Sequence, residues 1–246
     1  MERLVSIRIR VLIGFVAFLS VCFFAWSAPR TPAKNQTELF SQNSGMSSLN
    51  KVTGLPDPGT YKLQKIFKVP NLSVLDTKGK LQPISKYTTG KMTLLTFFYE
   101  RCSDVNGCPY VVGLFHGVKN KLEKDPNIRD SVRFVSISFD PQRDTPMMLA
   151  GLEKRASGVL ENKKSVEWDY LTTASIEKLM PVIDGFGQNV DVQMSPNTGN
   201  KSLTYSHVLK VFLIDGEGYV REIYSTSYLS QTMLLNDIQT LMAEKK

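Results

Sequence analysis

After about residue 66, hydrophobic and polar positions follow two alternating rhythms, and each rhythm predicts one kind of element. A continuous, largely apolar run at 92–99 (MTLLTFFY) predicts a strand that is buried on both faces of a sheet. At 109–124 the apolar residues recur at the spacing of one helix face, which predicts an amphipathic helix. The polar stretch at 187–201, with its Asn and Pro residues, predicts a loop. Further strands are predicted at 132–139, 166–171, 208–214 and 219–224, and further helices at 145–157, 175–186 and 230–243.

Two hairpins frame this alternation of strands and helices. The segments 67–75 and 81–84 flank a short turn that contains Gly79, and 208–214 and 219–224 flank the sequence DGEG. Strands that alternate with helices and end in a hairpin and a helix are typical of an α/β fold. The pattern therefore predicts a mixed central sheet flanked by helices, with an N-terminal hairpin extension.

The N-terminus has the pattern of an export signal. Arg3, Arg8 and Arg10 precede an apolar run at 11–26, which small residues follow. This run of 16 residues is shorter than the roughly 20 residues of a comfortable membrane span. A cleaved signal peptide and an uncleaved membrane anchor therefore both stay open for residues 1–28. In either case we expect an extracytoplasmic domain, in the bacterial periplasm, that is secreted or tethered to the inner membrane.

The rest of the chain divides into a tether and one domain. Residues 29–65 are rich in Ser, Asn, Thr, Pro and Lys and lack periodicity, which predicts a flexible tether. Residues 66–246 are predicted to form a single domain, and the 42% hydrophobic content excludes a disordered chain. The formal net charge is +7, but the basic residues are scattered, so we expect no nucleic-acid partner.

The cysteines carry the strongest chemical signal. Of three, Cys22 lies in the export segment, so the domain keeps one close pair, Cys102 and Cys108, in an oxidising compartment. The pair lies between a buried strand and a helix that begins near Pro109. Free N–H groups and the helix dipole favour a thiolate there, which predicts a stabilised Cys108 thiolate. Five residues, including Gly107, separate the two cysteines, so their sulfurs could meet in a disulfide or around a metal.

Several interpretations of this pair stay open on the residues alone. A structural disulfide is one, although such bridges usually close longer loops, and open α/β sheets place their sites at the carboxyl ends of strands. Two cysteines alone suit redox chemistry or copper(I), and a third ligand would favour a metal. His207, before the predicted strand at 208–214, is the candidate, because thiolates with imidazole suit copper. His116 is interpreted as a surface residue, and Asp140 as part of a turn or as a residue that lines the site.

Three sequence blocks, in this order, resemble one known family. They are FFYERCSDVNGCP at 97–109, FDPQRDTP at 139–146 and SHVLKVFLIDGEG at 206–218. From about residue 67 to 243 the chain thereby resembles the Sco/SenC family of thioredoxin-fold copper-binding proteins. That family is associated with assembly of the binuclear copper centre of cytochrome c oxidase.

The resemblance implies a thioredoxin-like fold and a copper site. It implies Cys102, Cys108 and His207 as copper ligands, with the two cysteines also forming a redox-active pair. The implied partners are a copper-receiving protein, such as a cytochrome c oxidase subunit, and a thiol reductant. An uncleaved N-terminal segment would add the membrane. One departure stands out, because three residues usually separate the family's cysteines and five do here.

Three functions are therefore compared. The first is a copper chaperone for a respiratory oxidase or another extracytoplasmic copper protein, and we predict this function rather than an enzyme. The alternative is a thiol–disulfide oxidoreductase that keeps a partner's cysteines reduced. Against it, the pair is not Cys-x-x-Cys, and Ser206 and His207 stand where a thioredoxin-type enzyme usually has a cis-proline. The third is an interaction domain with a merely structural cysteine pair.

Overall fold

A computed structural model describes residues 54–157, 165–194 and 203–244, and at 191–194 and 203–207 it describes the backbone. The apolar run at 11–26 lies outside these ranges. Within them, no helix is both long and apolar enough to cross a membrane.

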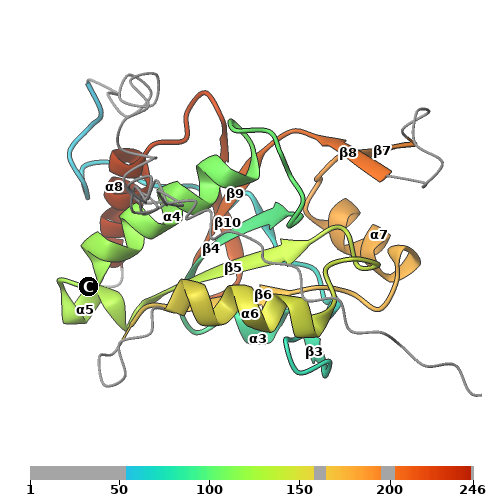
Figure 1. The fold of residues 1–246 in the computed structure, drawn as a ribbon. Coiled ribbons are helices and arrows are strands. Elements are labelled where there is room, and N and C mark those ends of the chain that lie inside the picture. Colours follow the sequence, from blue (N-terminus) through green and yellow to red (C-terminus); the bar gives the residue numbers. More distant parts are fainter. Residues whose placement is uncertain (1–53, 158–164, 195–202, 245–246) are drawn as a thin grey trace, which may run out of the picture.

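Six strands form the central sheet, in the order β1-β10-β9-β4-β5-β6. β4, β5 and β6 run parallel, whereas β1, β10 and β9 are each antiparallel to the strand that follows them in this order. The sheet is therefore mixed, as predicted (Figure 1). In sheet order the strands are β1 (Phe67–Lys68), β10 (Tyr219–Ser225), β9 (Lys210–Ile214), β4 (Met92–Phe98), β5 (Val132–Ser138) and β6 (Glu167–Leu171).

Helices cover both faces of this sheet (Figure 1). One face packs against α4 (Cys108–Leu122), α6 (Pro146–Ser157) and α8 (Gln231–Glu244). The other packs against α7 (Ile176–Gly185) and α3 (Ser85–Thr88). Every residue of β4 is buried as a result, which explains its continuous apolar sequence. The predicted strands and helices of this domain are confirmed, with ends that differ by at most two residues.

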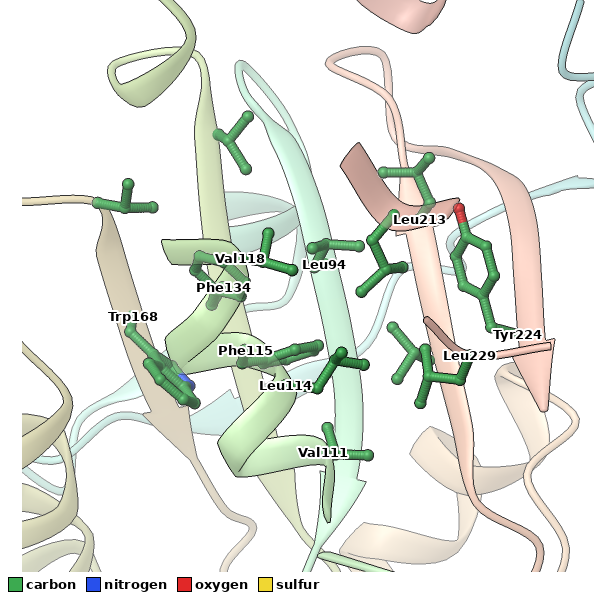
Figure 2. Close-up of a cluster of buried hydrophobic side chains, with 14 of the residues drawn as sticks. Leu94, Val111, Leu114, Phe115, Val118, Phe134, Trp168, Leu213, Tyr224 and Leu229 are labelled. Atoms are coloured by element: carbon green, nitrogen blue, oxygen red, sulfur yellow. The ribbon is translucent and has the colours of Figure 1, made fainter. Parts of the chain in front are cut away.

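Aromatic side chains fix α4 over the parallel strands (Figure 2). Phe115 of α4 packs against Phe134 of β5 and Trp168 of β6, with ring centroids 4.9 and 5.7 Å apart. At the first turn of α4, the Tyr110 hydroxyl donates a hydrogen bond to the carbonyl of Leu229, 2.8 Å away. The start of α4, and with it Cys108, is therefore held against the sheet edge.

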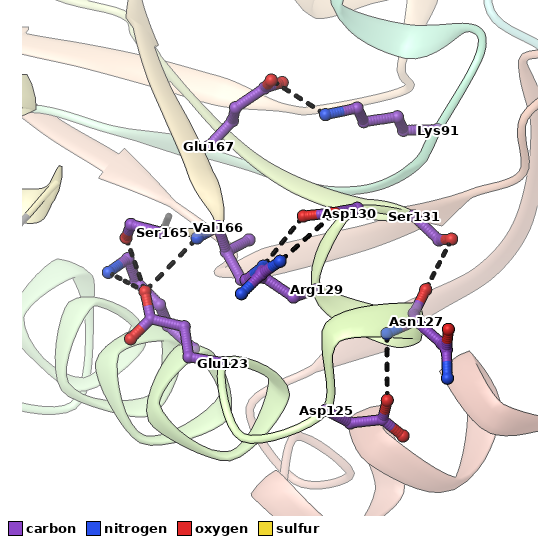
Figure 3. Close-up of polar contacts among 11 residues, drawn as sticks. Lys91, Glu123, Asp125, Asn127, Arg129, Asp130, Ser131, Ser165, Val166 and Glu167 are labelled. Carbon is purple, nitrogen blue, oxygen red and sulfur yellow. Dashed lines mark hydrogen bonds and ion pairs between the residues drawn. The ribbon is translucent and has the colours of Figure 1, made fainter. Parts of the chain in front are cut away.

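Polar contacts hold the opposite end of α4 (Figure 3). The Glu123 carboxylate accepts hydrogen bonds from the Ser165 hydroxyl and the Val166 amide, just before β6. It also pairs with Lys119 one turn earlier, at 2.6 Å. A short helix, α5 (Pro126–Arg129), follows and is capped by the side chain of Asp125. α4 is thus anchored at both of its ends.

The predicted N-terminal hairpin forms from shorter strands than expected. β2 (Ser73–Leu75) and β3 (Leu81–Pro83) pair across a turn that contains Gly79 at φ +72°. Residues 67–68, by contrast, form β1 at the edge of the central sheet. Since Pro70 has no N–H to donate, the pairing of this segment with β10 ends there.

The prediction of a loop at 187–201 was wrong for its first half. Residues 190–194 form β7 (Val190–Met194), which pairs antiparallel with β8 (Leu203–His207) in a separate two-stranded ribbon. In Figure 1 this ribbon projects from the central sheet on the side of α7. His207 is consequently the last residue of β8, and β9 begins three residues later at Lys210.

Residues 59–63 run along α8. The Gly59 amide donates to the Thr240 hydroxyl at 3.0 Å, and the Tyr61 hydroxyl donates to the Asp237 carboxylate at 2.5 Å. The Leu63 carbonyl accepts a hydrogen bond from the buried guanidinium of Arg221. We call residues 59–63 the strap, and it extends the packed structure into the region that the sequence grouped with the tether.

Candidate metal centre

The cysteine loop connects the carboxyl end of β4 to the first residue of α4. Within it, Asp104 folds the chain back, because its carbonyl accepts from the Gly107 amide and its carboxylate from the Asn106 amide. Gly107 is the N-cap of α4, and Cys108 is its first residue. Pro109 follows in the first turn, where a missing N–H costs the helix no hydrogen bond.

The loop brings the two predicted cysteines together. Both are thiols that form no disulfide in the described part of the chain, with Cys102 half-buried and Cys108 only 5% exposed. The two side chains are hydrogen-bonded to each other, so the five-residue spacing does not separate the sulfurs. Two soft donors therefore lie side by side at the carboxyl edge of the parallel strands, with Cys102 nearer the surface.

The protonation of Cys108 differs from what its helix position predicted. The hydrogen bond with Cys102, followed by burial, raises the pKa of the Cys108 thiol, although backbone amides of Tyr99 and Cys108 oppose the shift. This shift is opposite to the thiolate that the helix start predicted, because the hydrogen bond with Cys102 and burial outweigh the backbone amides. Burial, and next the charge of Cys102, raises the pKa of Tyr99 to about 12, and its hydroxyl is hydrogen-bonded to Cys102.

A buried carboxylate fastens the beginning of the cysteine loop. Asp144, 2% exposed, accepts a hydrogen bond from the Ser138 hydroxyl at 2.5 Å and one from the Glu100 amide at 3.1 Å. Burial raises the pKa of Asp144, and these two donors counteract it. This role was not predicted from the sequence, although Asp144 lies in the motif at 139–146, four residues after Asp140.

Asp140 takes the turn role that was one of its two interpretations. Its carbonyl accepts from the amides of Arg143 and Asp144, and its carboxylate pairs with the Arg143 guanidinium at 2.5 Å. The turn thereby delivers Asp144 to the loop that carries Cys102.

The structure locates His207 by its backbone. It ends β8, opposite Val190 of β7, and the next carbonyl, that of Val208, accepts a hydrogen bond from the Gln188 side chain at 2.8 Å. In the residues whose side chains are described, no group of three His, Cys, Asp or Glu is arranged to hold a metal. The geometry thus unites Cys102 and Cys108, and leaves the third predicted ligand as a prediction.

His116 is not the surface residue that the sequence suggested. Its ring packs on Trp168, with centroids 4.9 Å apart, and is only partly exposed. Burial lowers its pKa, and the nearby Lys119 adds to this effect. His116 therefore belongs to the outer layer of the α4 core.

A model of the SCO1/SenC family matches residues 65–243 of the chain. A search among curated protein sequences gave no match. The matched range covers the whole sheet and the helices described above, up to the penultimate residue of α8.

Solved structures of Sco proteins share this fold. The chain is similar to Arabidopsis thaliana ScoI, whose crystal structure has copper bound, with a TM-score of 0.59, 19% identity, and 72% of this chain and 99% of that chain covered. For copper-bound Bradyrhizobium japonicum ScoI the TM-score is 0.53 and the identity 21%, with 73% of this chain and 99% of that chain covered. BsSco is described as a member of the Sco family of cytochrome c oxidase assembly proteins. Its TM-score is 0.53 and its identity 20%, with 79% of this chain and 100% of that chain covered. The predicted thioredoxin-like fold is confirmed.

Proposed function

The chain belongs to the SCO1/SenC family, and from that premise we propose that it is a copper chaperone. It binds copper through Cys102, Cys108 and His207 and delivers it to a respiratory oxidase or another copper protein outside the cytoplasm. The observation that carries this proposal is the pair of mutually hydrogen-bonded thiols, not joined by a disulfide, at the edge of the sheet. Soft thiolates with an imidazole form a donor set that suits copper.

The solved relatives support the same cargo. The Arabidopsis and Bradyrhizobium proteins hold copper in their crystal structures, and BsSco is described as an oxidase assembly protein with a disulfide switch. These descriptions make copper the first metal to test here. The thiol–disulfide oxidoreductase alternative is not favoured, because the family match and the copper-bound structures both point to metal binding.

The unequal exposure of the two thiols suits a transfer by ligand exchange. Cys102 is half-buried and Cys108 is buried, so a partner's thiolate reaches the copper from the side of Cys102. The partner's sulfur bonds to copper as the bond to Cys102 breaks, and the released thiolate takes up a proton. Loading reverses this step, and it requires both cysteines reduced, so a thiol reductant is part of the proposal. Residues 1–28 would carry the domain to that compartment.

Copper titration of the reduced protein tests the proposal. We expect one copper per chain, and with Cu(II) an intense thiolate-to-copper charge-transfer band. Cys102→Ser or Cys108→Ser should remove the band or sharply weaken it, and His207→Ala should weaken binding by roughly tenfold or more while the cysteine redox couple survives. His116→Ala is the matched control and should bind copper as the wild type does, because its ring packs on Trp168.

Two results would overturn the proposal. Unchanged copper binding in His207→Ala would show that the three-ligand site is wrong. A protein that bound no copper but reduced disulfide substrates would be an oxidoreductase.

A further inference from the structure

Tyr99 is the first residue after β4 and begins the cysteine loop. The amide of Cys102 donates a hydrogen bond to the Tyr99 carbonyl at 3.2 Å, which closes a four-residue turn. Inside this turn, the Glu100 amide donates to the buried carboxylate of Asp144 at 3.1 Å. The turn is therefore fixed to the fold, and it brings Cys102 back beside Tyr99 at the carboxyl edge of the sheet.

The ring of Tyr99 is held in place by packing. It is half-buried and lies against the fully buried ring of Phe139, with centroids 5.3 Å apart. Phe139 is itself tied to the end of β4, because its amide donates to the Phe98 carbonyl at 3.0 Å. A ring that is packed in this way keeps one rotamer, so the direction in which its hydroxyl points is set by the fold.

Tyr99 contacts the sulfur atoms of both cysteines, but with different groups. Its hydroxyl is hydrogen-bonded to the side chain of Cys102, and its backbone amide donates to the sulfur of Cys108. The amide belongs to the backbone that leaves the sheet, so it is a fixed donor to the buried cysteine. The hydroxyl turns about its C–O bond, so it is an adjustable donor to the half-buried cysteine.

We propose that the Tyr99 hydroxyl makes Cys102 the copper ligand that leaves first, by donating a hydrogen bond to its sulfur in the loaded protein. This inference deepens the proposed function and rests on it. Copper replaces the thiol proton of Cys102 but leaves lone pairs on the sulfur, so the hydroxyl keeps its acceptor. A hydrogen bond to a metal-bound thiolate withdraws electron density from the sulfur, which weakens the metal–sulfur bond and tunes the site.

The hydrogen bond acts at one step of the ligand exchange. A partner's thiol loses its proton as its sulfur bonds to copper, and the bond between copper and Cys102 breaks. The electron pair stays on the sulfur of Cys102, where the Tyr99 hydroxyl stabilises it until a proton returns. Copper keeps its oxidation state, and Cys108 stays bound. Tyr99 is thus a positioning residue, because it acts through Cys102 and does not touch copper.

Tyr99→Phe in the full chain tests this role, because it keeps the ring against Phe139 and removes only the hydroxyl. From the Cu(I)-loaded variant, we expect the chelator bathocuproine disulfonate to remove copper about 3- to 10-fold more slowly than from the wild type. With Cu(II), the thiolate-to-copper band should move to longer wavelength. Without copper, the exchange equilibrium with glutathione should shift about 3- to 10-fold toward the disulfide, because reduced Cys102 loses a donor.

Tyr61→Phe is the matched control. It also removes one tyrosine hydroxyl, which here donates to Asp237 of α8, away from the cysteine loop. Copper release, the charge-transfer band and the glutathione equilibrium should all keep their wild-type values in this variant. Circular dichroism and thermal unfolding show that both variants are folded.

The readouts separate this inference from the proposed function. If the wild type bound copper, wild-type values in Tyr99→Phe for either copper release or the glutathione equilibrium would overturn the role of Tyr99 alone. Faster release from Tyr99→Phe, or equal slowing by Tyr61→Phe, would do the same. If the wild type bound no copper, the proposed function would fail first and this inference with it.

Discussion

At the carboxyl edge of β4 and β5, Cys108 and Asp144 are both ionisable and almost fully buried, and the pKa of each is raised. Their hydrogen-bond partners have different effects on the two groups. Asp144 receives hydrogen bonds from Ser138 and Glu100, which suit a carboxylate and tie the cysteine loop to the turn after β5. Cys108 is instead hydrogen-bonded to another thiol, which favours its protonated form. A bound copper ion would replace that proton.

Asp169 of β6, a half-buried acid, gives a prediction of pH-dependent stability. Burial, with a contribution from Glu153, raises its pKa to about 6, and Arg133 offsets only part of this. The folded protein thus holds this proton more tightly than the unfolded chain, and stability is lost as the pH rises from about 4 to about 6. Asp169→Asn should therefore raise the free energy of unfolding by about 2 kcal/mol at pH 7 and by about zero at pH 4.

Urea unfolding of Asp169→Asn and the wild type at pH values from 4 to 7 measures this effect. Glu167→Gln is the control on the same strand, because Glu167 forms an exposed ion pair with Lys91. Its stability should change by less than about 1 kcal/mol at either pH. A gain in Asp169→Asn that did not grow with pH would contradict the assignment.

At the scale of elements, the pattern of apolar residues predicted most of the fold because the sheet is covered on both faces. The run at 92–98 is buried throughout, and the helix at 108–122 meets it with one apolar face. β7 was not predicted, because the Asn and Pro residues at 187–201 are typical of a loop. Val190 and Val192 nevertheless alternate with polar residues, as in a strand. The two residues of β1 were predicted as part of the hairpin strand at 67–75. They form a separate strand because they pair with β10, which lies far away in the sequence.

The candidate site was predictable to the same extent. Cys102 and Cys108 were found from their position between a strand and a helix, which local sequence encodes. Asp144 and Gln188 were not, because their partners Glu100 and Val208 lie 44 and 20 positions away in the sequence. Only the folded chain shows which distant carbonyls and amides these side chains reach.

The end of α7 offers a test at the scale of one element. Gly187 has φ +59°, and a Cβ atom added there would meet no other atom within 4 Å. Gly187→Ala should therefore cost about 1 kcal/mol of stability, through backbone strain alone. Gly151 in α6 is the matched control, because a Cβ there lies no closer than 3.6 Å to a neighbour and the backbone is helical.

Gly151→Ala should accordingly raise stability by about 0.5–1 kcal/mol, so the two Gly→Ala changes are expected to have opposite signs. Chemical unfolding of both variants at one pH measures the difference. Equal effects of the two changes would show that the left-handed conformation at Gly187 does not govern this helix end.

At the scale of the whole molecule, the strap links the N-terminal part of the chain to the side of the domain formed by α8. Arg221 lies at the centre of this link, with Asp215 at 3.0 Å, Glu244 at 2.6 Å and the Leu63 carbonyl as its acceptors. The Asp237 carboxylate accepts hydrogen bonds from the hydroxyl groups of both Tyr61 and Tyr224. Two buried charged groups thus depend on the strap for part of their hydrogen bonding, although it lies outside the predicted domain at 66–246.

Removing the strap should therefore weaken the domain without touching the copper ligands. A fragment of residues 66–246 loses the buried side chain of Leu63, the hydroxyl of Tyr61 and an acceptor for Arg221. We expect it to be about 2–4 kcal/mol less stable than residues 54–246, since these losses outweigh the chain entropy that is released. Urea unfolding of the two fragments measures this, and both should bind copper equally when folded.

Single substitutions measure how much of the strap's contribution to stability comes from its hydrogen bonds. Tyr61→Phe removes one donor to the buried Asp237 and should cost about 1 kcal/mol in the longer fragment. Lys62→Ala changes the exposed neighbouring side chain and should alter stability by less than about 0.5 kcal/mol. Equal stability of the two fragments would mean that Arg221 and Asp237 find water in place of the strap. The domain would then begin at β1, and the contacts along α8 would contribute nothing to its folding.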